Sequence, residues 1–177
     1  MSARILLAVV VLASACRVES RATLDSAQAR DSVRLADSAF AAVQSRGKAV
    51  MGVDQYTSSH VFEDLPDGGR IALDRQDAAD AAGIAEIRRH MQSVADDFRK
   101  GDFAKPFAVH AQVVPGTAVM AARHDVITYA VVDRPRGAEV RITTREAAVV
   151  AAVHAFLAFQ RTDHRAPGHE GHAGHQM

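Results

Sequence analysis

Residues 60–74 read HVFEDLPDGGRIALD, and this stretch decides the fold class. Val61 and Phe62 lead into the turn sequence PDGG at 66–69, and Ile71 and Leu73 alternate with other residues after it. Two short runs that contain apolar residues and are joined by a turn rich in proline and glycine are typical of a β-hairpin. The stretch therefore predicts two antiparallel strands.

A helical pattern follows this hairpin in residues 77–100. Its apolar residues are spaced by three and four, which places them on one face of a helix. Gly101 then suits the end of that helix. The apolar positions are Ile84, Ile87, Met91, Val94 and Phe98.

The same order recurs in the second half of the chain. Residues 126–144, VITYAVVDRPRGAEVRITT, predict a second hairpin with its turn at 135–137. Thr143 and Glu146 have the spacing of a capping box, which predicts a helix that runs to about Arg161. In the connecting segment, residues 107–114 predict one further short strand, and a short helix is expected from 115 to near 124.

These elements predict an α+β fold. We expect a two-layer sandwich over residues 51–165, with an antiparallel sheet of about four strands that comes from two ββα units and with helices on one face.

The N-terminus, MSARILLAVVVLASAC, has one charged residue, then a short apolar run, and then small residues that lead to Cys16. This pattern predicts a signal peptide over residues 1–15. Residues 13–16 resemble a lipobox, although Ala13 stands where leucine is usual and also suits ordinary signal peptidase. Cys16 is the single cysteine, which favours a lipid anchor. With Arg17 after it, the resemblance implies the outer membrane, facing the periplasm.

Residues 16–50 are expected to hold the anchor site and a partly helical spacer. Val33, Ala36, Phe40 and Val43 have helical spacing, but this apolar stripe is thin. Both a solvated spacer and a docked helix remain open.

Composition excludes several classes of function. The chain has 21 Lys and Arg and 21 Asp and Glu, so a positively charged surface that binds nucleic acid is not expected. The sequence contains no G-x-S-x-G, H-E-x-x-H, P-loop or dinucleotide fingerprint. A non-enzymatic protein is therefore the leading expectation.

Histidines are the residues that could carry chemistry. The C-terminal tail, residues 166–177, is expected to be disordered, and imidazole is a common ligand for copper and zinc. The tail group is His164, His169, His172 and His175.

Three histidines of the domain form a second candidate group. His90 and His154 flank the apolar faces of the two predicted helices, so their rings could approach each other, with His110 as a third member. Such a group could hold a metal or catalyse proton transfer, whereas the structural alternative is a set of border residues.

Several short motifs together resemble a family of small exported bacterial proteins without an established activity. Some of its members carry an aspartate carbamoyltransferase label. Residues 143–146 read TTRE and match only part of the Ser-Thr-Arg-Thr loop of that enzyme, and one small domain is too short for it, so the label is rejected. The motifs are H-x-F at 60–62, PDGG-x-I at 66–71, I-R-x-H at 87–90, G-x-F-x-x-P at 101–106, VH at 109–110, PG at 115–116, PRG at 135–137 and VHAFLAFQRTDH at 153–164.

The sequence thus favours an exported lipoprotein that binds copper or zinc in the cell envelope and exchanges it with a metal-handling partner. A His-centred envelope enzyme, and an interaction module that uses a bare sheet face, are the alternatives.

Overall fold

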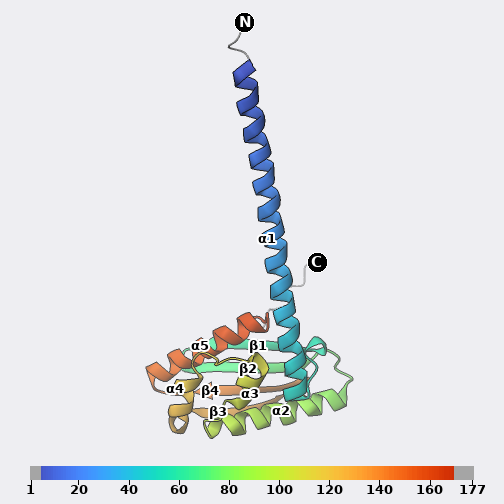
Figure 1. Cartoon of the computed structure of the whole chain (residues 1–177). Helices are drawn as coiled ribbons and strands as arrows, with labels where there is room; N and C mark the ends of the chain where they lie inside the picture. Colours follow the sequence, from blue (N-terminus) through green and yellow to red (C-terminus); the bar gives the residue numbers. More distant parts are fainter. Residues whose placement is uncertain (1–4, 170–177) are drawn as a thin grey trace, which may run out of the picture. The chain divides into compact units, whose positions relative to one another are not determined.

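The computed structural model describes the backbone of residues 5–169 and the side chains of residues 27–169 (Figure 1). The two hairpins, each followed by a long helix, occur in the predicted order. The elements are α1 (Ile5–Met51), the 3-10 turn η1 (Gln55–Thr57), β1 (Ser58–Leu65), β2 (Gly68–Arg75), α2 (Ala81–Arg99), α3 (Ala104–His110), α4 (Thr117–Ala122), the 3-10 turn η2 (His124–Val126), β3 (Thr128–Arg134), β4 (Gly137–Thr143) and α5 (Ala147–Asp163).

Four antiparallel strands form one sheet in the order β1-β2-β4-β3, which confirms the α+β prediction. Each predicted hairpin is present, with Phe62 paired to Ile71 and Val131 paired to Val140. Each long helix packs on the hairpin of the other ββα unit. Helix α5 packs on β1 and β2, whereas α2 packs mainly on β3 and β4. Both helices lie on the same face of the sheet, with α3 and α4 between them (Figure 1).

The core lies between this sheet face and the helices. Ile71, Leu73, Val140 and Ile142 point into it from the two central strands, and all are buried. Phe98 of α2 packs edge to face on Phe156 of α5, with ring centres 5.9 Å apart. Because both helices contribute rings to one cluster, the two ββα units share a single core.

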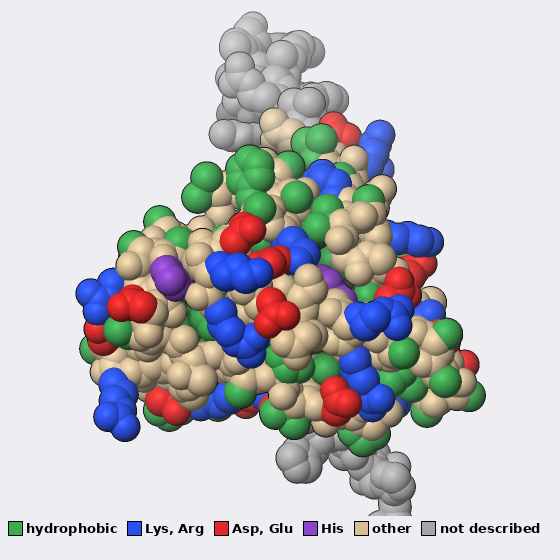
Figure 2. Space-filling view, turned by 90° about the horizontal axis from the view of Figure 1, so that it is seen from below, with side chains coloured by type: hydrophobic (Ala, Val, Ile, Leu, Met, Phe, Trp, Pro, Cys, Tyr) green, Lys and Arg blue, Asp and Glu red, His purple; other side chains and the backbone are tan. Residues whose placement is uncertain are grey.

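The opposite face of the sheet is charged. Arg70 bonds to Glu63 and Glu139, and Arg134 bonds to Glu139 and Asp74. Figure 2 shows basic and acidic side chains interspersed over the face that it views. This sheet face is therefore not the apolar surface that the interaction-module alternative requires.

The connecting segment differs from the prediction. Residues 104–110 form helix α3, not part of a strand, and Asp102 Oδ1 accepts a hydrogen bond from Ala104 N. Pro106 lies in the first turn, where its missing N–H costs nothing, and shares one buried side of the helix with Val109 and His110. The buried residues of this segment are spaced by three and four, as in a helix, and do not alternate as they would in a strand.

The predicted C-terminal end of α2 is confirmed, whereas the predicted N-terminal cap of α5 is not. Gly101 follows α2 with a φ of +73°, as predicted for a terminating glycine. The predicted capping box of Thr143 and Glu146 is wrong, because Thr143 is still in β4. Glu146 is itself the N-cap of α5, and its N–H donates to Thr144 Oγ1 at 3.3 Å.

The chain divides into two compact units, Met1–Ala39 and Phe40–Met177. The second unit begins within α1, and Val43 and Gln44 are buried in it. The domain thus starts before the predicted boundary at residue 51. Among the described residues, none of the helices combines the length and hydrophobicity needed to cross a membrane. Cys16 lies outside the residues whose side chains are described.

Candidate functional site

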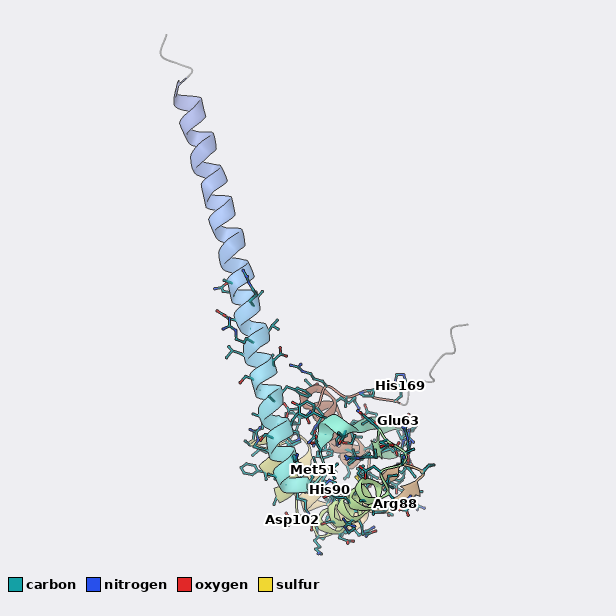
Figure 3. The ribbon with its side chains drawn as sticks, turned by 90° about the vertical axis from the view of Figure 1, so that its right-hand side faces the viewer. Met51, Glu63, Arg88, His90, Asp102 and His169 are labelled. Atoms are coloured by element: carbon teal, nitrogen blue, oxygen red, sulfur yellow. The ribbon has the colours of Figure 1, made fainter. Side chains whose placement is uncertain are left out.

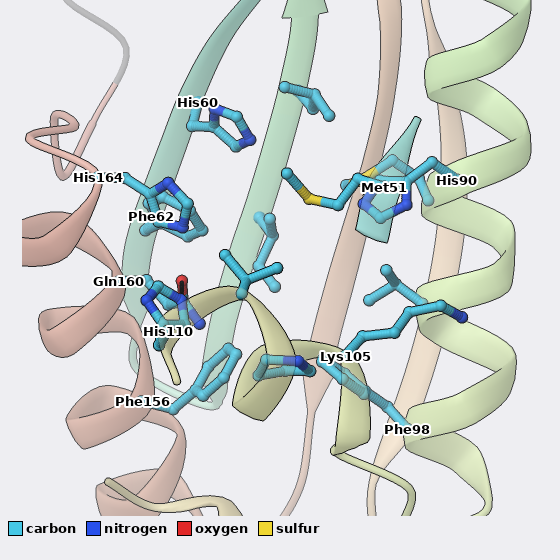
Figure 4. A pocket seen from close by; sticks show the side chains of 16 residues that line it. Met51, His60, Phe62, His90, Phe98, Lys105, His110, Phe156, Gln160 and His164 are labelled. Carbon is cyan, nitrogen blue, oxygen red and sulfur yellow. Dashed lines mark hydrogen bonds between the residues drawn. The ribbon is translucent and has the colours of Figure 1, made fainter. Parts of the chain in front are cut away.

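A small cavity of about 70 Å³ lies between the sheet and the helices (Figure 4). We call it the inner pocket. Its wall is mostly apolar, and its side chains include Met51, Phe62, Phe98 and Phe156. Four histidines also line it, namely His60, His90, His110 and His164.

These histidines come from four separate parts of the chain. His60 is in β1, on the same face as Phe62, and His110 is the last residue of α3. His164 directly follows α5. Figure 4 shows these three rings on one wall of the pocket, with His90 of α2 and Lys105 on the opposite wall.

His60 and His164 stack on each other, with ring centres 5.2 Å apart and an interplanar angle of 20°. His164 Nδ1 lies 2.9 Å from Gln55 Oε1. A carbonyl oxygen can only accept, so Nδ1–H donates and the Nε2 of a neutral ring keeps its lone pair. Gln55 therefore sets the tautomer of His164, as an outer partner does for a metal ligand.

His110 is held from both sides. Its Nδ1 donates to the carboxylate of Asp163, and its Nε2 lies 2.9 Å from Gln160 Oε1. Its ring centre is 5.0 Å from that of His164. A carboxylate behind a histidine that faces a pocket is the usual second layer of a metal centre.

Burial keeps three of the rings neutral. Loss of solvent is the main cause in each case, because it disfavours the charged ring. It lowers the pKa of His60 to about 4, with the nearby His90 adding to the effect. It lowers the pKa of His90 to about 4, helped by Lys105, and that of His164 to about 3, helped by His60 and His110 and opposed by Asp163.

The ring separations suit a shared ion. Two imidazoles that bind one tetrahedral ion through bonds of about 2.0–2.1 Å have ring centres roughly 5 Å apart. His164 already has this separation from both His60 and His110. Within the described part of the chain, however, no group of three or more His, Cys, Asp or Glu side chains is placed so that it could hold a metal ion as it stands. The stacked rings would have to turn to bind one.

Met51 lies beside His90 in both views (Figure 3; Figure 4). It is half-buried at the end of α1, and both residues line the inner pocket. A thioether is a soft ligand that suits reduced copper. Met51 and His90 are therefore available as further ligands across the pocket from the three rings.

The predicted site residues are partly brought together. His90 and His110 share the inner pocket, but His154 does not line it. His154 Nε2 instead donates to Leu65 O at 3.0 Å, so the predicted approach of His90 and His154 is wrong. His164, grouped with the tail in the prediction, belongs to the domain.

The tail itself begins in contact with the domain. Phe62 N donates to Pro167 O at 3.2 Å, and His169 is exposed nearby. His172 and His175 lie outside the described residues. His60 is one of the scattered histidines of the domain and is not in the predicted group of His90, His110 and His154, although its place two residues before Phe62 puts it on the buried side of a strand.

Comparison of the chain with protein-family models, curated proteins and solved structures finds no match. The resemblance to small exported bacterial proteins therefore stays a prediction.

Proposed function

We propose that this protein binds copper or zinc in the cell envelope through His60, His110 and His164, and exchanges the ion with a metal-handling partner. The observation that carries the proposal is the approach of His164 to both His60 and His110, at two ring separations that suit ligands of one ion. The proposed activity is binding and transfer, without a catalysed reaction.

The protonation and outer contacts of the rings support this assignment. A metal ligand must be a neutral imidazole, and His60 and His164 are neutral at pH 7 without help from the ion. Gln55 orients His164, and Asp163 orients His110. His110 Nε2 faces a carbonyl oxygen and therefore donates to Gln160 Oε1, so an ion at this nitrogen would displace that proton. Gln160 Oε1 would then be close at hand as a fourth ligand, after the three imidazole nitrogens.

The site is accessible enough for exchange. His60 and His164 are half-buried, whereas the His110 side chain is only 1% exposed. An incoming ion would reach the first two rings and then His110. His169 lies at the start of the tail on the same side of β1, so the tail could capture an ion before the pocket holds it.

Titration with zinc and with copper(I), by calorimetry and by competition with a chromophoric chelator, tests the proposal. His60→Gln and His164→Gln are each expected to weaken binding by more than about 100-fold, because each removes a ligand. Asp163→Asn is expected to weaken it by about 10–100-fold, because the ligand remains but loses its orienting carboxylate.

Two further variants separate this site from the tail. His154→Gln changes a half-buried histidine of α5 outside the pocket and is the matched control, expected to bind as the unchanged protein does. Replacement of His169, His172 and His175 by glutamine is expected to slow capture but keep the tight site. Tight binding that disappears with the tail residues, or that survives His164→Gln, contradicts the proposal.

We further propose that Cys16 carries the lipid that holds the protein at the outer membrane, on its periplasmic side. The N-terminal motif and the single cysteine support this location. Cys16→Ser is expected to abolish labelling by radioactive palmitate and to move the protein from the membrane fraction to the soluble fraction. A Cys16→Ser protein that still sediments with membranes contradicts a lipid anchor at this residue.

A further inference from the structure

The sheet has two edge strands, β1 and β3, one from each ββα unit (Figure 1). Each hairpin turns through two residues, and the pair of residues that closes such a turn is hydrogen-bonded. Hydrogen-bonded and non-hydrogen-bonded pairs alternate along antiparallel strands. Phe62 of β1 and Val131 of β3 each lie three residues before the closing pair. Their N–H and C=O groups therefore point outward, away from the sheet.

The chain itself covers the edge of β1 at this position but leaves the edge of β3 open. Phe62 N donates to Pro167 O at 3.2 Å, and Phe62 O accepts from Arg161 Nη1 at 2.8 Å. Among the described residues, the N–H and C=O of Val131 have no partner outside the sheet. An uncovered edge of this kind is a template for one more strand.

The sequence of β3 lacks the features that usually prevent such pairing. The strand reads TYAVVDR, its first five residues carry no charge, and it pairs with β4 without a bulge. It contains neither proline nor lysine, the residues that often protect an edge. Of the strands that the structure describes, only β3 exposes a large hydrophobic side chain, that of Val132, which is 49% exposed.

We infer that β3 pairs with β3 of a second copy of this chain, antiparallel and across a two-fold axis at Val131, so that the two sheets become one. In this register the outward groups of Val131 bond to those of Val131 in the second copy. The outward groups of Tyr129 face those of Asp133. Ala130 and Val132, both exposed, meet across the axis and bury each other. The strand therefore complements itself, as a two-fold interface requires.

The charges at this edge also match a second copy. Arg99 of α2 reaches the edge, where its Nη2 donates to Tyr129 O. The Asp133 side chain is 68% exposed and lies on the same face as α2, 3.5 Å from Arg88. Because position 129 faces position 133, the pairing brings the carboxylate of Asp133 from one copy to Arg99 of the other, and the symmetry repeats this contact. This match identifies the occupant of the edge as a second copy.

Sedimentation velocity of the metal-free full chain, measured over a hundredfold range of concentration, tests the inference. The chain carries Cys16→Ser, which prevents both lipid attachment and a disulfide between copies. A monomer is expected at the lowest concentration and a dimer at the highest. A monomer at every concentration overturns the inference. None of the edge residues lines the inner pocket, so the inference is independent of the proposed metal site.

The first pair of variants tests whether the dimer forms through β3. Val132→Lys is expected to weaken the dimer at least tenfold, because it removes an apolar cross-strand contact and brings two ammonium groups near each other. Val113→Lys changes a valine that is 74% exposed between α3 and α4, and it is the matched control, expected to have no effect. Equal weakening by both variants would show association through exposed apolar residues in general and overturns the assignment to β3.

The second pair tests the register. Asp133→Arg is expected to weaken the dimer at least tenfold, because it places a second cation beside Arg99 of the other copy. Addition of Arg99→Glu to the same chain is expected to restore most of the affinity. A dimer that survives both Val132→Lys and Asp133→Arg overturns the inference, and if Val132→Lys does not fold, the Asp133→Arg and Arg99→Glu pair decides it.

Amide hydrogen exchange gives a local measurement of the same contact. The Val131 N–H is expected to exchange at least tenfold more slowly in concentrated than in dilute protein, since pairing covers it. His164→Gln, which removes a proposed metal ligand, is expected to leave the dimer unchanged, so failure of one proposal is distinguishable from failure of the other. A Val131 exchange rate that does not depend on concentration contradicts pairing at this edge.

Discussion

Acidification of the metal-free protein from pH 7 to pH 5 is expected to lower its free energy of unfolding by several kcal/mol. His60, His90 and His164 have pKa values of about 4, 4 and 3 when folded, below the ordinary value of 6.5. Between pH 6.5 and pH 4 the unfolded chain therefore binds more protons than the folded chain, and stability falls as the pH falls.

The size of this effect follows from the shifts. One pKa unit corresponds to about 1.4 kcal/mol, so each ring costs up to about 2 kcal/mol at pH 5. The sum of the three losses is to be compared with the total free energy of unfolding of a domain, which is about 5–15 kcal/mol. Below pH 4, the lowered pKa values of Asp54, Asp67 and Asp80 add a separate loss as these carboxylates become protonated.

Urea unfolding at half-unit steps from pH 7.5 to pH 4.5 measures this dependence. His60→Gln and His90→Gln are each expected to reduce the slope between pH 6.5 and pH 4.5, because one ring fewer takes up a proton on unfolding. Lys100→Gln, an exposed change outside the pocket, is expected to leave the slope unchanged. A stability that stays constant over this range contradicts neutral rings in the folded protein.

Gly116→Ala is expected to destabilise the domain by about 2–5 kcal/mol. Gly116 has a φ of +82°, and a side chain in this left-handed conformation costs roughly 1–2 kcal/mol. A Cβ there would also lie far inside van der Waals contact of Ala152 O, with Phe156 N at 3.2 Å. These are backbone atoms of α5, so they cannot turn away, and overpacking of this kind costs roughly 1–3 kcal/mol more.

Gly52→Ala is the matched control for this change. Gly52 has a similar φ of +72°, but its nearest neighbour is Glu86 Oε1 at 2.8 Å, the end of a flexible side chain. Its substitution should therefore cost only the backbone strain, roughly 1–2 kcal/mol. Equal losses in the two variants, measured by chemical denaturation, would show that close packing of α4 on α5 contributes nothing.

The candidate site was only partly predictable. His110 and His164 were recognised as possible ligands from their residue type alone, and His164 was assigned to the wrong group. His154 was placed near His90 because both flank helices, but the register of α5 turns His154 toward Leu65 O. The alternation of residues in β1 could have placed His60 beside Phe62 on the buried face of the sheet. No local pattern in the sequence indicates that α3 brings His110 to the same pocket.

The sequence by itself determined the two hairpins, the apolar face of α2 and the repeat of the ββα unit, because these depend on spacings of two to four residues. Only the tertiary structure decided which histidines meet. His60, His110 and His164 lie about fifty residues apart along the chain. Their meeting depends on the strand order, which pairs β2 with β4, and on the packing of α5 over β1 and β2. These long-range contacts arise from burial of the shared core, which local spacing does not encode.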